Sequence, residues 1–150
     1  MPPRRTAVTL LSSALALGAL AGCSKPTPAV TLVSDGRHVR SEATLYCRAG
    51  QTPAKRNCAT AHHGPTVLSV RQGSHVGVDV DRTLAKHGWY LVDVDNKQRT
   101  AVQDTHFFSF DANFSQRSQK GVITLEVRSV DHVAENAKDT GTWVFQLLQR

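Results

Sequence analysis

The sequence predicts an all-β domain built as an antiparallel β-sandwich. Short apolar segments recur at near-regular intervals after residue 29, and Gly, Asp, Asn and Ser residues that favour turns separate them. In Val76–Asp81 valine alternates with Gly or Asp, the pattern of a strand with one buried and one solvated face. No long segment has the periodicity of an amphipathic helix. Some eight short strands in one domain are typical of two sheets packed face to face.

The expected strands share a high content of Val, Thr, Leu and aromatic residues. In chain order they are Val30–Val33, Ala43–Cys47, Thr66–Val70, Val76–Asp81, Trp89–Val94, Thr105–Phe110, Val122–Val130 and Trp143–Leu148. Asp35-Gly36, Gln72-Gly73-Ser74 and Asp95-Asn96-Lys97 have turn chemistry and separate neighbouring strands. Helix is expected only as one turn over Arg82–His87, which Gly88 ends, and a turn or two over Val133–Lys138.

The later strands carry most of the expected core. Trp89–Val94 is apolar on both faces, as in a central strand, and Trp89 is interpreted as a core residue. Neighbouring residues of a strand point to opposite faces, so Phe107 and Phe108 diverge and at least two of the three phenylalanines Phe107, Phe108 and Phe110 belong to the core. The predicted buried set is Val78, Val80, Trp89, Leu125, Val127 and Phe145.

The N-terminal segment has the order of a secretory lipoprotein signal. Arg4 and Arg5 precede an apolar stretch that ends in Leu20-Ala21-Gly22-Cys23. Basic residues, an apolar stretch and small residues before a cleavage site are the parts of a signal peptide. The tetrapeptide looks like a bacterial lipobox, so we expect cleavage before Cys23 and attachment of diacylglycerol to its sulfur. Two or more acyl chains anchor a protein stably, whereas one chain is marginal.

These features divide the chain into a signal peptide (residues 1–22), a lipidated cysteine with its spacer (residues 23–28) and one β-sandwich domain (residues 29–150). The expected location is the cell membrane, lipid-anchored on its extracytoplasmic face. The alternative is a transmembrane helix, but Ala7–Ala21 is shorter than the ~20 residues needed to span a bilayer, and no basic stop-transfer cluster follows. The sequence leaves the general secretory and twin-arginine export routes open.

With Cys23 lipidated, Cys47 and Cys58 remain, and an exported protein is expected to pair them in a disulfide. The loop between them is polar and cannot be held by burial. The alternative is a zinc ion bound by Cys47, Cys58, His62 and His63. The spacing of these residues differs from the short Cys-x₂₋₄-Cys pairs of structural zinc sites, so the disulfide is favoured.

The charge of the domain is mild and scattered. The full chain has a formal charge of +6, and removal of Arg4 and Arg5 with the signal leaves 16 basic against 12 acidic residues, or +4. A nucleic-acid-binding protein concentrates its basic residues in a patch or stripe. Scattered charge therefore argues against nucleic acid as a partner.

Motifs of catalysis are missing from the sequence. A hydrolase would show Gly-x-Ser-x-Gly or His-Glu-x-x-His, and neither occurs. Asp79, Asp81, Asp93 and Asp95 would gather four carboxylates, enough to attract calcium, if their two strands were neighbours. The simpler interpretation is that these positions are polar because they face solvent. We therefore expect no enzyme activity and no cofactor.

Seven histidines raise a copper or zinc hypothesis. A blue-copper site needs two histidines, a cysteine and usually a methionine, but Met1 is the only methionine and leaves with the signal. A looser copper or zinc site remains an alternative, with candidate imidazole ligands at His62, His63, His75, His87 and His106.

Five segments together resemble a family of actinobacterial lipoproteins. They are Cys23-Ser24-Lys25-Pro26-Thr27-Pro28, Glu42–Cys47, Gly88-Trp89-Tyr90, Gln103–Phe110 and Gly141-Thr142-Trp143. Members of that family carry a domain of unknown function behind a lipobox. The resemblance implies an envelope location and an immunoglobulin-like or cupredoxin-like sandwich, and it implies no catalytic residues.

The function expected from this combination is a non-catalytic binding module tethered to the membrane at Cys23. Its partner would be an envelope protein, a glycan or an anionic ligand. Binding residues usually lie on loops held by a rigid scaffold, and the longest expected loop, Arg48–Pro65, is basic and bears histidines. The candidate contact residues in and after the disulfide loop are Arg48, Lys55, Arg56, His62 and His63.

Overall fold

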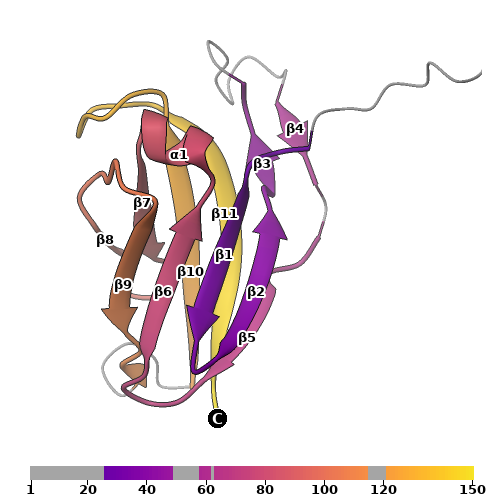
Figure 1. Ribbon diagram of the computed structural model, residues 1–150, viewed down its shortest axis with the longest axis vertical. Coiled ribbons are helices and arrows are strands. Elements are labelled where there is room, and N and C mark those ends of the chain that lie inside the picture. Colours follow the sequence, from indigo (N-terminus) through magenta and orange to yellow (C-terminus); the bar gives the residue numbers. More distant parts are fainter. Residues whose placement is uncertain (1–25, 49–57, 62, 115–120) are drawn as a thin grey trace, which may run out of the picture.

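The computed structural model describes residues 26–48, 58–61, 63–114 and 121–150, which form two β-sheets and one short helix (Figure 1). The first sheet has the strand order β2 (Arg37–Glu42), β1 (Ala29–Ser34), β6 (His75–Val80) and β9 (Phe107–Asp111). The second sheet has the order β4 (Ala59–Thr60), β3 (Leu45–Tyr46), β11 (Asp139–Gln149), β10 (Val122–Val130), β7 (Trp89–Asp93) and β8 (Gln98–Arg99), and β5 (Thr66–Val70) also pairs with β11. The prediction of a β fold is confirmed in that the described residues are mostly β with one short helix, and the two sheets are consistent with a sandwich.

Among the described strands, pairing is antiparallel with one exception. Strands β10 and β11 form the longest pair, from Val122 opposite Leu148 to Val130 opposite Asp139. Strand β5 runs parallel to β11, with Thr66 opposite Phe145. The expectation of a wholly antiparallel sandwich is wrong at this pair, because β5 and the C-terminal half of β11 lie side by side in the same direction.

Local chemistry explains where several elements begin and end. Asp35 and Gly36 form the two-residue turn between β1 and β2 with φ of 51° and 72°. Positive φ at both central residues matches the type I′ turns that suit the twist of a hairpin. Helix α1 (Arg82–His87) has the predicted bounds: the Asp81 carboxylate accepts a hydrogen bond from the Thr83 amide at its start, and Gly88 with φ of 103° ends it.

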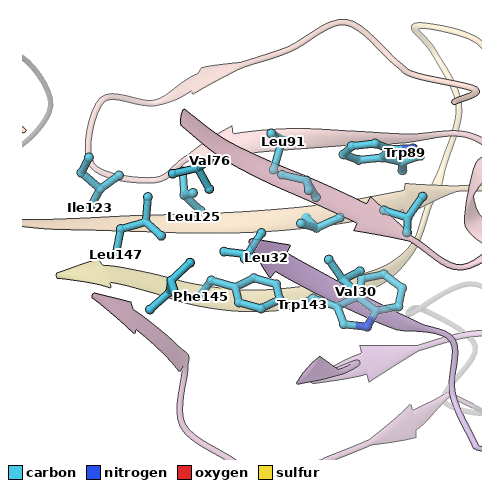
Figure 2. Close-up of a cluster of buried hydrophobic side chains, with 14 of the residues drawn as sticks. Val30, Leu32, Val76, Trp89, Leu91, Ile123, Leu125, Trp143, Phe145 and Leu147 are labelled. Carbon is cyan, nitrogen blue, oxygen red and sulfur yellow. The ribbon is translucent and has the colours of Figure 1, made fainter. Parts of the chain in front are cut away.

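One hydrophobic core lies between the two sheets (Figure 2). Val30 and Leu32 of β1 belong to this cluster together with Phe145 and Leu147 of β11, and all four side chains are fully buried. Burying one such side chain contributes roughly 1.5–3 kcal/mol. The predicted buried set is confirmed in full: Val78, Val80, Trp89, Leu125, Val127 and Phe145 are each at most 3% exposed.

The phenylalanines of β9 divide as predicted. Phe108 and Phe110 are partly buried and pack against the core, and the Phe108 ring meets Trp89 at a centroid distance of 6.5 Å. Phe107 points to the opposite face and is 54% exposed. Its ring lies over Gly77 of β6, where a Cβ atom would stand 2.6 Å from the ring.

The structure differs from the sequence-based expectation in several segments. The strand expected over Ala43–Cys47 is limited to Leu45–Tyr46. Strands β2, β4 and β8 were not predicted, and residues 133–138 form bends and a turn instead of helix. The helical expectation there is wrong because the Asp131 carboxylate accepts a hydrogen bond from the Lys138 amide at 3.0 Å. That bond closes the loop between β10 and β11 as a compact turn.

Candidate functional site

The segment that leads into β1 is fixed to the fold by hydrogen bonds along three consecutive residues. Thr27 Oγ1 accepts a hydrogen bond from the Ala43 amide at 3.3 Å, and the Pro28 carbonyl accepts one from the Trp143 indole at 3.0 Å. The Ala29 carbonyl accepts a third from the Asp81 amide at 3.3 Å. Because Trp143 is fully buried, this segment is attached directly to the core.

A cleft of about 770 Å³ opens beside this segment. We call it the root cleft, and its lining residues are Pro26, Thr27, Pro28, Ala29, Arg40, Glu42, Tyr46, Arg48, Ala59, Asp81 and Thr83. They come from the lead-in segment, β2, the β3–β4 hairpin and the start of α1. In Figure 1 the hairpin, the helix and the start of β1 lie at one end of the molecule, and the C-terminus lies at the other.

Two arginines of the root cleft have no carboxylate partner among the described residues. Arg40 and Arg48 are both exposed, and neither takes part in an ion pair or side-chain hydrogen bond in this part of the chain. Arg128 is different, because it donates to Glu126 at 2.6 Å and to Asp139 at 3.3 Å. The guanidinium groups of the cleft are therefore available to solvent or to a ligand.

Tyr46 supplies the aromatic wall of the root cleft. Its ring packs against Trp143 at a centroid distance of 6.1 Å. Burial raises the pKa of its hydroxyl, the nearby Asp81 carboxylate adds to the rise, and Arg48 opposes it. No hydrogen-bond partner for this hydroxyl occurs within the described ranges, where no buried side-chain polar atom is left unsatisfied. The hydroxyl thus reaches solvent as a neutral hydrogen-bond donor at physiological pH.

The disulfide predicted from the cysteine count joins Cys47 to Cys58, with the Cα atoms 4.2 Å apart. It follows the β3–β4 pairing, in which Tyr46 lies opposite Ala59 and Leu45 opposite Thr60. The stretch predicted as one long loop therefore contains a short strand. Because Tyr46, Arg48 and Ala59 line the cleft, the covalent link and the strand pairing together hold this wall in place.

Only some of the contact residues predicted from the sequence lie within the described residues. Cys23, Lys55, Arg56 and His62 lie outside the described residues. Arg48 lines the root cleft, as the sequence interpretation would require of a binding residue. His63 is exposed and is not among the lining residues, and its Nδ1 lies 3.2 Å from the carbonyl of the adjacent Gly64.

Arg40, Glu42 and Tyr46 were not predicted as contact residues from the sequence. Arg40 and Glu42 belong to β2, a strand whose polar composition concealed it. The turn at Asp35-Gly36 was the available signal, since such a turn predicts a second strand after it. Alternation along that strand would then have placed Arg40 and Glu42 on its solvated face.

The described part of the chain contains no group of three or more His, Cys, Asp or Glu side chains that could hold a metal ion. The proposed gathering of Asp79, Asp81, Asp93 and Asp95 does not occur, because β6 and β7 belong to different sheets. The described histidines that were candidate ligands lie on separate elements. His75 pairs with Asp111 at 2.5 Å, and His106 Nδ1 lies 3.3 Å from the Val80 carbonyl.

A second hollow of about 590 Å³ lies on the outer face of the first sheet, around Gly77 and beside Phe107. The large exposed apolar side chains, Val67, Val94, Phe107 and Val133, come from separate elements of the described chain. Apolar residues exposed singly are normal on a protein surface. The root cleft, which combines charged groups with an aromatic wall, is the stronger candidate.

Comparison with known proteins gives a family but no function. A family model described as "Protein of unknown function (DUF2771)" matches residues 24–144. No curated protein and no solved structure matches the chain. Within the described residues, no helix is long and apolar enough to cross a membrane.

Proposed function

Since the chain belongs to the DUF2771 family of proteins of unknown function, we propose its role from its own residues: a non-catalytic binding module, tethered by lipid at Cys23 to the outer face of the cell membrane. The observation that carries this proposal is the lead-in segment, whose residues Thr27 to Ala29 are bonded to the core. An anchor at Cys23 would then act directly on the domain.

Chain length gives this arrangement a scale. Three residue steps separate Cys23 from Pro26, so their Cα atoms lie at most about 11 Å apart. A lipid on Cys23 would hold the end of the sandwich that contains the root cleft close to the headgroups. At 0.1 M salt the Debye length is about 10 Å, so charges at this end would act on the membrane surface.

A binding role is supported by the chemistry of the root cleft. Arg40, Arg48 and the Tyr46 hydroxyl face solvent as donors, and residues 1–150 contain neither the Gly-x-Ser-x-Gly nor the His-Glu-x-x-His motif of hydrolases. The partner classes remain an envelope protein, a glycan or an anionic ligand.

Three finer features belong to the same proposal. Residues 1–22 act as a cleaved signal peptide, the source is an actinobacterium, and the two sheets form an immunoglobulin-like or cupredoxin-like sandwich. The first is supported by Arg4, Arg5 and the lipobox-like residues before Cys23. An experimental structure of the exported protein, compared with sandwiches of known topology, tests the third.

Metabolic labelling with an alkyne fatty acid tests the anchor. The wild type should become labelled and fractionate with membranes, whereas Cys23→Ser should lose the label and leave the membrane fraction. Cys47→Ser and Cys58→Ser are matched controls that should keep the label. Persistent labelling of Cys23→Ser would refute the anchor assignment, and stoichiometric copper or zinc in the purified protein would favour the metal-binding alternative.

A further inference from the structure

We propose that the root cleft binds the zwitterionic headgroup of an aminophospholipid, a phosphodiester next to a primary ammonium. This inference rests on the proposed function, which brings the cleft to the membrane surface. It adds a ligand class and assigns roles to particular side chains. Arg40 and Arg48 would bind the phosphate, and Glu42 would bind the ammonium.

The hydrogen-bond donors that line the cleft suit a phosphate. The planar guanidinium group presents paired N–H donors that match two phosphate oxygens, and charge-assisted bonds of this kind are the stronger class of hydrogen bond. Arg40 and Arg48 are unpaired in the described chain, so binding breaks no existing ion pair. The Tyr46 hydroxyl and the exposed Thr83 lie on the same lining and can donate to further oxygens.

The carboxylates on the lining explain why a zwitterion fits better than a simple anion. Glu42 and Asp81 also line the cleft, so two carboxylates balance the two guanidinium groups. Asp81 already accepts the Thr83 amide at 3.0 Å. Glu42 is exposed and has no side-chain partner within the described ranges. Glu42 would repel a simple anion, whereas it would attract an ammonium group next to the phosphate of a zwitterion.

The size and position of the cleft agree with this ligand. Its volume of about 770 Å³ lies within the roughly 300–1,000 Å³ of small-molecule sites. The cleft lies beside residues 26–29, and two of the elements that line it, the β3–β4 hairpin and the start of α1, lie at the end of the molecule opposite the C-terminus (Figure 1). A lipid headgroup is thus the ligand present at the highest concentration where the cleft would lie.

The test uses the full purified chain, isotopically labelled, in nonionic detergent micelles. Amide chemical shifts are followed during titration with glycerophosphoethanolamine, glycerophosphoglycerol and inorganic phosphate at constant ionic strength. We expect saturable shifts at Tyr46, Ala59 and Thr83, with the tightest binding for glycerophosphoethanolamine. The double variant Arg40→Gln/Arg48→Gln should weaken that binding by about tenfold or more, since it removes two charge-assisted contacts.

Two single variants separate the roles. Glu42→Gln should bring the affinity for glycerophosphoethanolamine down to that for glycerophosphoglycerol, because it removes the partner of the ammonium. Arg37→Gln is the matched control: Arg37 lies exposed on the same strand without an ion pair in the described chain and does not line the cleft. This control should leave all affinities unchanged. Well-dispersed amide spectra verify that each variant is folded.

A second arm identifies the source of the headgroup. In phosphatidylglycerol nanodiscs, adding phosphatidylethanolamine should shift the same three amides without any soluble ligand. Shifts that appear only with the soluble phosphodiester would overturn the lipid assignment. Absence of saturable shifts, equal binding by the double variant, or tighter binding of glycerophosphoglycerol would overturn the site. The titrations with soluble phosphodiesters do not depend on acylation, so failure of the anchor is recognised separately by fatty-acid labelling.

Discussion

Alanine substitutions at two similarly crowded glycines of the sheets are expected to destabilise the fold by different amounts. A Cβ at Gly77 would stand 2.6 Å from the Phe107 ring and 2.7 Å from Val33, whereas a Cβ at Gly141 would stand 2.8 Å from Ser129 Oγ and 2.9 Å from the Trp143 ring. By distance alone, Gly77→Ala is the worse substitution. What decides the free energy is whether the neighbours can move.

At Gly77 both crowding side chains can give way, because Phe107 is 54% exposed and Val33 is only half-buried. We expect Gly77→Ala to cost at most about 1 kcal/mol, the lower end of the range for added volume in a packed site. At Gly141 the neighbours are fixed. Trp143 is fully buried, and Ser129 shares a buried hydroxyl hydrogen bond of 2.9 Å with Thr140.

The cost of Gly141→Ala has two parts. Overpacking a core contributes about 1–3 kcal/mol, and losing the Ser129–Thr140 bond adds about 0.5–1.5 kcal/mol, for a total of about 1.5–4.5 kcal/mol. Urea denaturation followed by tryptophan fluorescence measures this. With a slope of about 2 kcal/mol/M, Gly141→Ala should lower the midpoint by about 1–2 M, and Gly77→Ala by less than about 0.5 M. Equal midpoints, or a larger effect at Gly77, would refute the argument that neighbour mobility sets the cost.

Three further predictions concern the disulfide, acid stability and the basic loop. Cys47→Ala/Cys58→Ala removes a link spanning 11 residues and should cost about 3 kcal/mol in the chain-entropy model, measured as the difference in urea stability between oxidised wild type and variant. The hydrogen bond from the Lys138 amide lowers the pKa of the Asp131 carboxyl in the folded state. The ionised carboxylate therefore stabilises the fold fully above the unfolded pKa of about 3.9, and this stabilisation is lost as pH falls through the lower folded pKa. Asp131→Asn should therefore lose less stability than wild type as the pH falls through this range, and parallel curves would contradict this. Lys55→Glu/Arg56→Glu should weaken binding to anionic vesicles and change the free energy of unfolding by at most about 0.5 kcal/mol. Unchanged vesicle binding would mean that the contact lies elsewhere.

The sequence predicts best where burial dictates the residue pattern. Strands β5 and β10 and helix α1 have the expected bounds, because apolar alternation in the strands and the Asp81 cap and Gly88 stop of the helix are local signals. Strand β11 was predicted too short, since its first residues, Asp139 to Thr142, are mostly polar or lack a side chain. The partners of β5 could not be predicted, because parallel pairing with β11 joins segments far apart in the chain.

The candidate site was predicted only in part, because only some of its residues have a local signal in the sequence. Arg48 was identified from the basic loop around the cysteines, which is a local composition signal. Arg40 and Glu42 come from β2, where Val39 and Ser41 are the inward positions but only Val39 is apolar. A strand at the edge of a sheet needs little burial to form once its hairpin turn is in place. Its register against β1, which places Arg40 opposite Thr31, follows from three-dimensional pairing and not from composition.

The pairing of charges distinguishes the two ends of the sandwich. At the end near the C-terminus, Asp35 accepts hydrogen bonds from Arg150 and Ser74, each at 3.0 Å, and these bonds lower its pKa. At the root cleft, Arg40 and Arg48 have carboxylates on the same lining and still form no ion pair with them in the described chain. An exposed ion pair contributes at most about 1 kcal/mol, so leaving these groups apart costs the fold little. It leaves donors and an acceptor separated from one another on the lining of one open cleft, and a ligand that carries both signs can satisfy them together. The same separation predicts that a lone anion binds weakly, which makes the preference for glycerophosphoethanolamine over inorganic phosphate the sharpest measurement of what the cleft recognises.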